Sequence, residues 1–402
     1  MRSVALQELR FHWTRNGAAL GELRNKFFPR TIGPCPARFT RSQNHSPMQD
    51  SNGGGAPSGR PNRSNTLGDP RLDQMVRDLV GEIQTEKPRE LIEEMIVTAL
   101  KMARDQTSVA DLKMLNRALK ELRYAVRVFA PYRDRMKVAV FGSARTPEDA
   151  EEFKAAENFG REMRERGYMI VTGGGDGIMG AAQRGAGREN SFGLNIRLPF
   201  EQSANQTIEG DKKLMSFNYF FTRKLNFVKE THAIALFPGG FGTMDEGFEV
   251  LTLMQTGKAR IFPVVLVDKP GGTYWQTWLA FLRGHLLKLR LISEDDFHFL
   301  HHCESVECAV EHIARFYHNY HSSRWVGPRL VLRLQRPLSQ KLIEHMDTEF
   351  NDVFASGKFI QSGALPEESN EPDIAHLPRL VFQPRRRNFG RLRKVIDAVN
   401  RE

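Results

Sequence analysis

Short apolar runs alternate with amphipathic segments between residues 137 and 269, and this alternation constrains the fold more than any other feature. Each apolar run is nearly continuous, which is typical of strands in a parallel sheet covered on both faces. Because parallel strands joined by helices cross over in the right-handed sense, the pattern predicts a doubly wound, mainly parallel, Rossmann-like α/β sheet. The predicted strands are 137–144, 168–175, 192–199, 232–240 and 262–269, and the predicted helices are 148–166, 178–186, 217–230 and 242–257.

The segments outside residues 131–319, which we take as the Rossmann-like domain, differ in composition from it. Residues 1–70 lack sustained periodicity and end in a Gly/Ser/Asn/Pro-rich linker, so we predict a disordered basic tail. Residues 71–130 are predicted to form a helical lead-in. One face of its first helix carries Leu72, Met75, Val76, Leu79 and Ile83. Alternating strand and helix patterns over 320–402 predict a small C-terminal α/β appendage.

The net charge of +10 is unevenly distributed, since residues 1–47 hold eight Arg or Lys and two Glu. More than half of the excess therefore lies in the tail, and we expect no nucleic-acid partner for the folded part. The Arg-rich start loosely resembles a transit peptide, and translation from Met48 is a second interpretation; we favour a segment outside the fold.

The length of apolar runs and the use of cysteine bear on the compartment. No apolar run approaches the roughly 18 to 20 residues of a membrane helix, so no membrane partner is expected. Three cysteines make no disulfide framework, which indicates a reducing compartment, and we predict a cytoplasmic protein.

Glycine-rich turns follow three of the predicted strands. The first strand ends in Gly142–Ser143, the second in TGGGDG and the fourth in PGGFGT. Glycine lets the backbone approach a phosphate, and the N–H groups at the start of the next helix point toward an anion there. The turns therefore predict one mononucleotide-sized ligand that is held from several strand ends. None of these turns is followed by the Lys-Ser/Thr that a Walker P-loop requires.

Residues 175–180 also form a literal G-x-G-x-x-G, with Glu201 near the spacing of a ribose-binding acid. Three observations count against a dinucleotide site. The motif lies in the second βα unit and not in the first, and Glu201 follows Pro199 and does not end a strand. The glycine turn at 238–242 is also a competing site for the phosphate. A tight turn that packs helix on strand is the structural alternative. We expect no cofactor.

Three ordered motifs resemble the Lonely guy family, whose members are described as cytokinin riboside 5′-monophosphate phosphoribohydrolases and were long labelled lysine decarboxylase-like. These motifs are GGGDGIMG, the Thr222–Lys224 segment and FPGGFGTMDE. The family pattern PGGxGTxxE is matched at every fixed position, and its Arg-Lys pair is matched by Arg223 and Lys224. The resemblance covers roughly residues 136–315 and leaves out both ends of the chain.

The resemblance implies an enzyme that hydrolyses the N-glycosidic bond of a nucleoside 5′-monophosphate, either AMP or a cytokinin ribotide, to the free base and ribose 5-phosphate. It implies catalytic roles for Glu246, beside the ribose, and Arg223. It also implies a homodimer. A non-catalytic module that binds or senses a nucleotide in the same pocket is the alternative function. The substrate-binding residues implied are Ser143, Gly173, Gly174, Gly175, Lys224, Gly239, Gly240, Gly242 and Thr243.

Each catalytic candidate has a structural alternative. Thr243 to Glu246 reads T-x-x-E, a capping box in which Thr243 is the N-cap and Asp245 only favours the helix dipole. Arg223 and Lys224 could be solvated charges on a helix whose buried stripe is Phe217, Phe220, Phe221, Leu225 and Val228.

The cluster His301, His302, Cys303, Cys308 and His312 invites a metal interpretation. Its spacing completes none of the usual zinc patterns, and a structural site needs four convergent ligands. We therefore predict no metal site.

Overall fold

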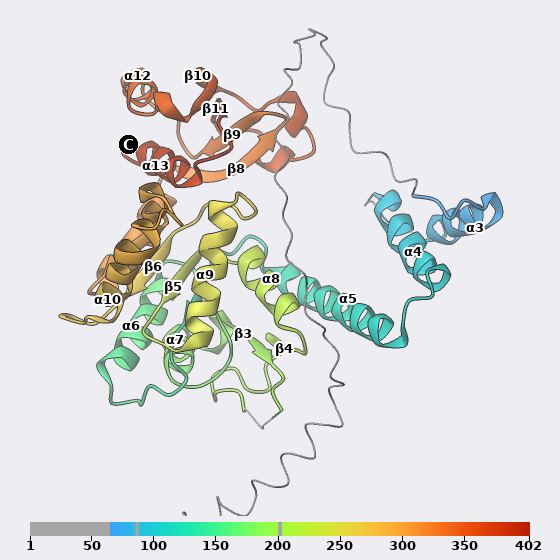
Figure 1. Ribbon diagram of the computed structural model, residues 1–402, viewed down its shortest axis with the longest axis horizontal. Helices are drawn as coiled ribbons and strands as arrows, with labels where there is room; N and C mark the ends of the chain where they lie inside the picture. The colour runs from blue at the N-terminus through green and yellow to red at the C-terminus, as the bar shows by residue number, and fades with distance from the viewer. Residues whose placement is uncertain (1–64, 84, 86–87, 200–202) are drawn as a thin grey trace, which may run out of the picture. The chain divides into compact units, whose positions relative to one another are not determined.

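The computed structural model describes residues 65–83, 85, 88–199 and 203–402 (Figure 1). Residues 1–64 of the predicted tail over 1–70, and Glu201, lie outside the described residues. The chain divides into two compact units, residues 1–97 and 98–402. Every helix of the described part is too short or too polar to cross a lipid bilayer.

The first unit contains helix α3 (Pro70–Gly81) and most of α4 (Arg89–Arg104). Asp69 caps α3 by accepting hydrogen bonds from the backbone N–H groups of Arg71 and Leu72. The small core of this unit consists of Leu67, Val76 and Val97. Of the predicted apolar face of α3, only Val76 is buried, whereas Leu72, Met75, Leu79 and Ile83 are exposed.

The second unit is built on a seven-stranded sheet in the order β4-β3-β2-β1-β5-β6-β7, in which every pairing is parallel. The predicted doubly wound, Rossmann-like α/β fold is confirmed. Its strands are β1 (Lys137–Phe141), β2 (Met169–Thr172), β3 (Ser191–Ile196), β4 (Leu214–Phe217), β5 (Ala233–Leu236), β6 (Val264–Val267) and β7 (Leu300–Cys303).

Helices cover both faces of this sheet, because side chains alternate between the faces along each strand. Val138 and Val140 of β1 pack with α6, α7 and α11 in one core, whereas Ala139 and Phe141 pack with α5, α8 and α9 in the other. Figure 1 shows α8 and α9 together in front of the strands. The helices are α5 (Val109–Phe129), α6 (Glu151–Glu165), α7 (Ile178–Ala186), α8 (Phe220–Glu230), α9 (Phe241–Gln255), α10 (Tyr274–Phe281), continued by a π-helical segment (Leu282–Leu287), and α11 (Val306–Phe316).

The five predicted strands and four predicted helices of the core are present. The strands are shorter than predicted, α7 has the predicted bounds, and α9 begins one residue earlier than predicted. Ser108 caps α5 as predicted, by accepting a hydrogen bond from the N–H of Asp111. The sequence missed β4 and β7, the two edge strands, because an edge strand is not buried on all sides and lacks a continuous apolar run. Phe217 accordingly belongs to β4, and the predicted helix over 217–230 begins at Phe220.

A four-stranded antiparallel sheet in the order β10-β11-β9-β8 forms the C-terminal appendage. It begins at Tyr320, and β8, which forms a hairpin with β9, was also missed by the sequence. Buried Glu368 forms ion pairs with Arg333 and Arg379 at 2.7 and 3.0 Å inside this part of the chain. The elements are β8 (Tyr320–Val326), β9 (Arg329–Leu334), α12 (Gln340–Glu349), β10 (Phe354–Ser362), β11 (Arg379–Pro384) and α13 (Phe389–Val399).

Two glycines let α6 and α7 pack backbone against backbone. A Cβ on Gly160 would lie 2.0 Å from the carbonyl oxygen of Ala182, and a Cβ on Gly185 would lie 1.9 Å from that of Glu157. No side chain can move to relieve either contact, so both positions require glycine for the helices to hold the strand ends in place.

We predict that Gly185→Ala lowers the free energy of unfolding by about 1–3 kcal/mol or more, as overpacked cores do. Gly284→Ala is the matched control, since a Cβ there meets no atom within 4 Å among the described residues. Denaturant unfolding of both variants measures the effect, and equal stability of the two would contradict the close helix packing.

Candidate functional site

The glycine turns after β1, β2 and β5 are joined by backbone hydrogen bonds at the carboxyl edge of the sheet. The N–H of Ser143 donates to the carbonyl of Pro238 at 3.1 Å, and the N–H of Ile178 donates to the carbonyl of Ser143 at 3.0 Å. Gly177, with φ +60°, could not carry a Cβ, because it would lie 2.3 Å from the carbonyl oxygen of Ser143. A Cβ on Gly239 would lie 2.2 Å from the Thr243 hydroxyl. The turns thus lock the three strand ends around one point.

A cavity of about 420 Å³ opens at this point, where the strand order reverses between β1 and β5. Ligands of open α/β sheets bind at such a switch point. The cavity faces the N-terminal turn of α9, where the backbone N–H groups have no acceptor within the helix. Its lining consists of Phe141, Gly142, Ser143, Ala144, Arg145, Gly173, Met179, Arg223, Gly240, Phe241, Gly242, Thr243 and Glu246.

Glu246 and Arg223 form a buried ion pair in the wall of this cavity. The Arg223 Nη2 lies 3.3 Å from the Glu246 Oε1, and the Glu246 side chain is only 3% exposed. The rings of Phe220 and Phe227 lie 5.1 and 5.8 Å from the guanidinium carbon. The buried Nε of Arg223 has no hydrogen-bond acceptor among the described residues. A buried donor of this kind normally has a partner, so a ligand oxygen is a suitable acceptor for it.

Lys224 lies behind the pair, surrounded by three carboxylates. Its Nζ lies 2.6 Å from Glu249 Oε2, 2.9 Å from Asp245 Oδ2 and 3.9 Å from Glu246 Oε2. Burial alone would lower the pKa of Lys224, but hydrogen bonds to Glu249 and Asp245 outweigh it and raise the pKa. The ammonium group therefore stays charged and joins α8 to α9.

Burial raises the pKa of Glu246 from its ordinary 4.5 to about 7. The positive charges of Lys224 and Arg223 oppose this shift, while Glu249 and Asp245 add to it. A carboxyl group that titrates near neutral pH inside a cleft is typical of functional sites, because both of its protonation states are accessible there.

The structure brings most of the predicted site residues together. Both catalytic candidates line the cavity, as do Ser143, Gly173, Gly240, Gly242 and Thr243. The other four predicted residues are Gly174, Gly175, Gly239 and Lys224, and they lie outside the lining. The carbonyls of Gly174 and Gly175 instead accept hydrogen bonds from the Asn205 side chain, at 3.0 Å each.

The alternative of a capping box at Thr243 is wrong. Helix α9 begins at Phe241 with Gly240 as its N-cap, so Thr243 lies inside the first turn and Glu246 in the second. The helix therefore begins directly after the glycine turn, two residues before the position that the T-x-x-E spacing predicts for its N-cap. Asp245 also has a further role, since it binds Lys224.

The alternative for Arg223 and Lys224 is also wrong, because the predicted faces of α8 are exchanged. Phe220, Phe221 and Leu225 are about half exposed, whereas both cations are only 13% exposed. The carboxylates of α9 that pair with the cations are more than 20 residues away in sequence, so the helical pattern alone could not reveal which face is packed.

The lining also contains six residues that were not among the predicted site residues, namely Phe141, Gly142, Ala144, Arg145, Met179 and Phe241. Arg145 follows the first turn directly, within FGSART, and its position next to a glycine turn was an available signal. Phe241 sits inside the PGGFGT motif and is 95% exposed at the start of α9.

Three possible metal ligands converge at β7 and α11. Donor atoms of His301, Cys303 and Cys308 all lie within 4.8 Å of one another. The His312 ring stacks on His301, with centroids 3.8 Å apart, but the Nε2 of His312 lies 3.0 Å from Arg393. A nearby guanidinium disfavours a cation, and our prediction of no metal site stays a prediction.

The fold and the cavity define a Rossmann-like α/β protein with glycine-rich turns at the sheet edge and a buried Glu-Arg pair. Residues 179–313 match the family model described as "Possible lysine decarboxylase". The resemblance of this region to the Lonely guy family is thereby confirmed, over a narrower range than predicted.

Two curated relatives carry the name cytokinin riboside 5′-monophosphate phosphoribohydrolase. A probable one from Oryza sativa subsp. japonica is 32% identical over 151 residues, which are 36% of this chain and 58% of the relative. One from Arabidopsis thaliana is 28% identical over 149 residues, which are 36% of this chain and 66% of the relative. The chain thus spans less than two thirds of the length of these relatives.

Among solved structures, the molybdenum cofactor carrier protein from Chlamydomonas reinhardtii aligns with a TM-score of 0.32 and 19% identity. The alignment covers 45% of this chain and 97% of that chain.

We predict that the stability difference between Glu246→Gln and the wild type depends on pH. The folded protein holds the Glu246 proton up to about pH 7, whereas the unfolded chain releases it near 4.5, so the wild type loses stability as pH rises through this window. Gln does not ionise, so the free energy of unfolding of the variant rises relative to that of the wild type over this window. The rise is at most about 3 kcal/mol, at about 1.4 kcal/mol per pKa unit. Denaturant unfolding between pH 4 and 8 measures the difference.

Thr243→Ser is the control for this experiment, because it removes no ionisable group from the cavity, and its difference from the wild type should not vary with pH. A pH-independent difference for Glu246→Gln would contradict the raised pKa.

Proposed function

We propose that the protein hydrolyses the N-glycosidic bond of a nucleoside 5′-monophosphate, giving the free base and ribose 5-phosphate. The observation that carries this proposal is the buried Glu246–Arg223 pair facing a cavity at the start of α9. The names of the curated relatives support it, and they point to a cytokinin riboside 5′-monophosphate as the substrate.

The 5′-phosphate binds at the N-terminal turn of α9. Backbone N–H groups around Gly240 and Gly242, together with the Ser143 and Thr243 hydroxyls, offer donors, and the helix dipole favours an anion. Arg145, which follows the turn after β1, adds a positive charge to the lining of the same cavity. This remote binding energy positions the ribose for the chemical step.

Glu246 lies one helical turn further along, next to the ribose. As the bond between C1′ and the base nitrogen breaks, the base leaves with the electron pair and positive charge builds on the sugar. The Glu246 carboxylate stabilises this charge, and a water oxygen then bonds to C1′, its proton passing to the departing base directly or through the carboxyl group. A group with a pKa near neutrality suits either proton role.

Arg223 holds the Glu246 carboxylate in place and keeps one donor for the ligand. Its Nη2 binds Glu246, while its free Nε can donate to a ribose hydroxyl or to the base. Its guanidinium does not act as a base, because it stays protonated. Lys224 neutralises the carboxylates behind the pair.

We expect the pure protein to release free base from at least one of AMP, GMP, CMP, UMP and isopentenyl-AMP, as measured by chromatography of the reaction mixture. Release from none of them, with binding retained, would favour the alternative of a nucleotide-binding or sensing module. The pattern of release among the five substrates gives the base preference.

We predict that Glu246→Gln lowers kcat on the best substrate by about 10² to 10³, the usual effect of removing a transition-state electrostatic contact. Glu249→Gln is the matched control, since Glu249 also binds Lys224 but lies outside the cavity lining, and it should lose less than about tenfold. Melting temperatures establish that both variants fold. Wild-type turnover in Glu246→Gln would rule out its catalytic role.

A further inference from the structure

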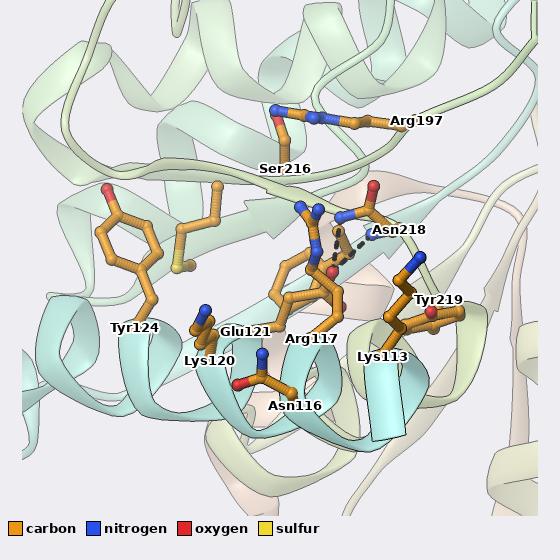
Figure 2. A pocket seen from close by; sticks show the side chains of 12 residues that line it. Lys113, Asn116, Arg117, Lys120, Glu121, Tyr124, Arg197, Ser216, Asn218 and Tyr219 are labelled. Atoms are coloured by element: carbon orange, nitrogen blue, oxygen red, sulfur yellow. Dashed lines mark hydrogen bonds between the residues drawn. The ribbon is translucent and has the colours of Figure 1, made fainter. Parts of the chain in front are cut away.

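A second and larger cavity, of about 660 Å³, lies within residues 98–402 and shares no lining residue with the cavity of Glu246. Helix α5 forms one wall, and the opposite wall consists of Arg197 and the segment that runs from β4 to α8 (Figure 2). A volume of this size suits a nucleotide-sized ligand. The lining residues are Lys113, Asn116, Arg117, Lys120, Glu121, Tyr124, Arg197, Met215, Ser216, Phe217, Asn218 and Tyr219.

Four positive charges converge on this cavity. Lys113, Arg117 and Lys120 are spaced four and three residues apart and therefore share one face of α5. Arg197, which follows β3, faces them from the opposite wall, as Figure 2 shows. Within the described part of the chain none of the four forms an ion pair or a hydrogen bond through its side chain, whereas Arg223 and Lys224 of the candidate site are both paired with carboxylates.

Glu121, the one acidic residue of this lining, forms no ion pair with the four cations, and its oxygens instead accept three hydrogen bonds from uncharged groups. Glu121 accepts hydrogen bonds from the backbone N–H of Asn218 at 2.9 Å, from the Asn218 side chain at 2.6 Å and from the Thr222 hydroxyl at 2.7 Å. Its side chain is buried, and the dashed lines in Figure 2 mark the bonds to Asn218. These bonds join the two walls, so the cavity is formed before any ligand enters.

The remaining lining suits an organic phosphate better than a bare ion. Tyr124 and Tyr219 offer aromatic surface at two places in the cavity, and Asn116 and Ser216 offer uncharged hydrogen-bonding groups. Guanidinium groups match the geometry of phosphate oxygens, and ammonium groups add charge without directional demands.

We propose that this cavity is a second ligand site, which binds a small molecule carrying a diphosphate or larger phosphate group. Arg117 and Arg197 hold the phosphate oxygens from opposite walls, and Lys113 and Lys120 neutralise the remaining charge. The proposal does not depend on the hydrolysis proposed above, because binding is measured without turnover.

Calorimetric titration of the full chain with inorganic pyrophosphate and with ADP tests the proposal. Arg117→Glu is expected to weaken binding at one site by tenfold or more, the usual loss for a charge-assisted phosphate contact. Binding at the cavity of Glu246 should persist in this variant, so the number of sites per chain falls by one. Lys113→Ala with Lys120→Ala is a milder second variant with the same expected direction.

Arg123→Glu is the matched control, because Arg123 lies on the same helix, is exposed and is outside the cavity lining. It changes the net charge equally and should leave binding within about twofold, since exposed charges are screened by salt. Equal losses in Arg117→Glu and Arg123→Glu, or no loss in either, would overturn the site. Tighter binding of a single-stranded oligonucleotide than of ADP, lost in Arg117→Glu, would assign the cavity to a polynucleotide and would equally overturn a small-ligand site.

Discussion

The hydrogen bonds that link the turns after β1, β2 and β5 determine where everything else in the candidate site lies. Ser143 donates from its backbone to Pro238 and accepts at its carbonyl from Ile178, so one residue ties three strand ends together. The contact distances leave no room for a Cβ at Gly177 or Gly239. Because the turns are fixed, the first turns of α7 and α9 start at fixed points, and the cavity at the sheet edge follows from them. Their glycines therefore serve the packing of the turns as much as access for a ligand.

Burial and charge act against each other in the network that links α8 and α9. Taking Glu246 out of water disfavours its ionised form, and the cations of Arg223 and Lys224 offset only part of that effect. The result is a carboxyl group that is neither permanently charged nor permanently neutral at physiological pH. The helix face that carries Arg223 and Lys224 is turned inward to meet these carboxylates, which leaves Phe221 and Leu225 exposed. In this arrangement both cations of α8 are paired with carboxylates of α9.

The two cavities differ in how their cations are balanced, and this difference separates their chemistry. Around Glu246, both Arg223 and Lys224 have carboxylate partners, which suits a reaction in which charge develops and disappears. Between α5 and the β4–α8 segment, the four cations have no such partners among the described residues, which suits a ligand with a permanent negative charge. Both cavities use the segment around α8, since Glu121 binds Asn218 and Thr222 directly before Arg223.

The sequence by itself determined the layered fold and the position of the glycine turns. Continuous apolar runs marked the five inner strands, because burial on both faces requires apolar side chains at every position. The two edge strands of the parallel sheet, β4 and β7, lacked that mark. The glycine motifs likewise located Glu246 and Arg223 through their family pattern. Only the tertiary structure decided that Glu246 lies in the second turn of α9 and not in a capping box, and that α8 turns its charged face inward. It alone placed Arg197 opposite Lys113 and Arg117, because residues about 80 positions apart meet only when the chain folds.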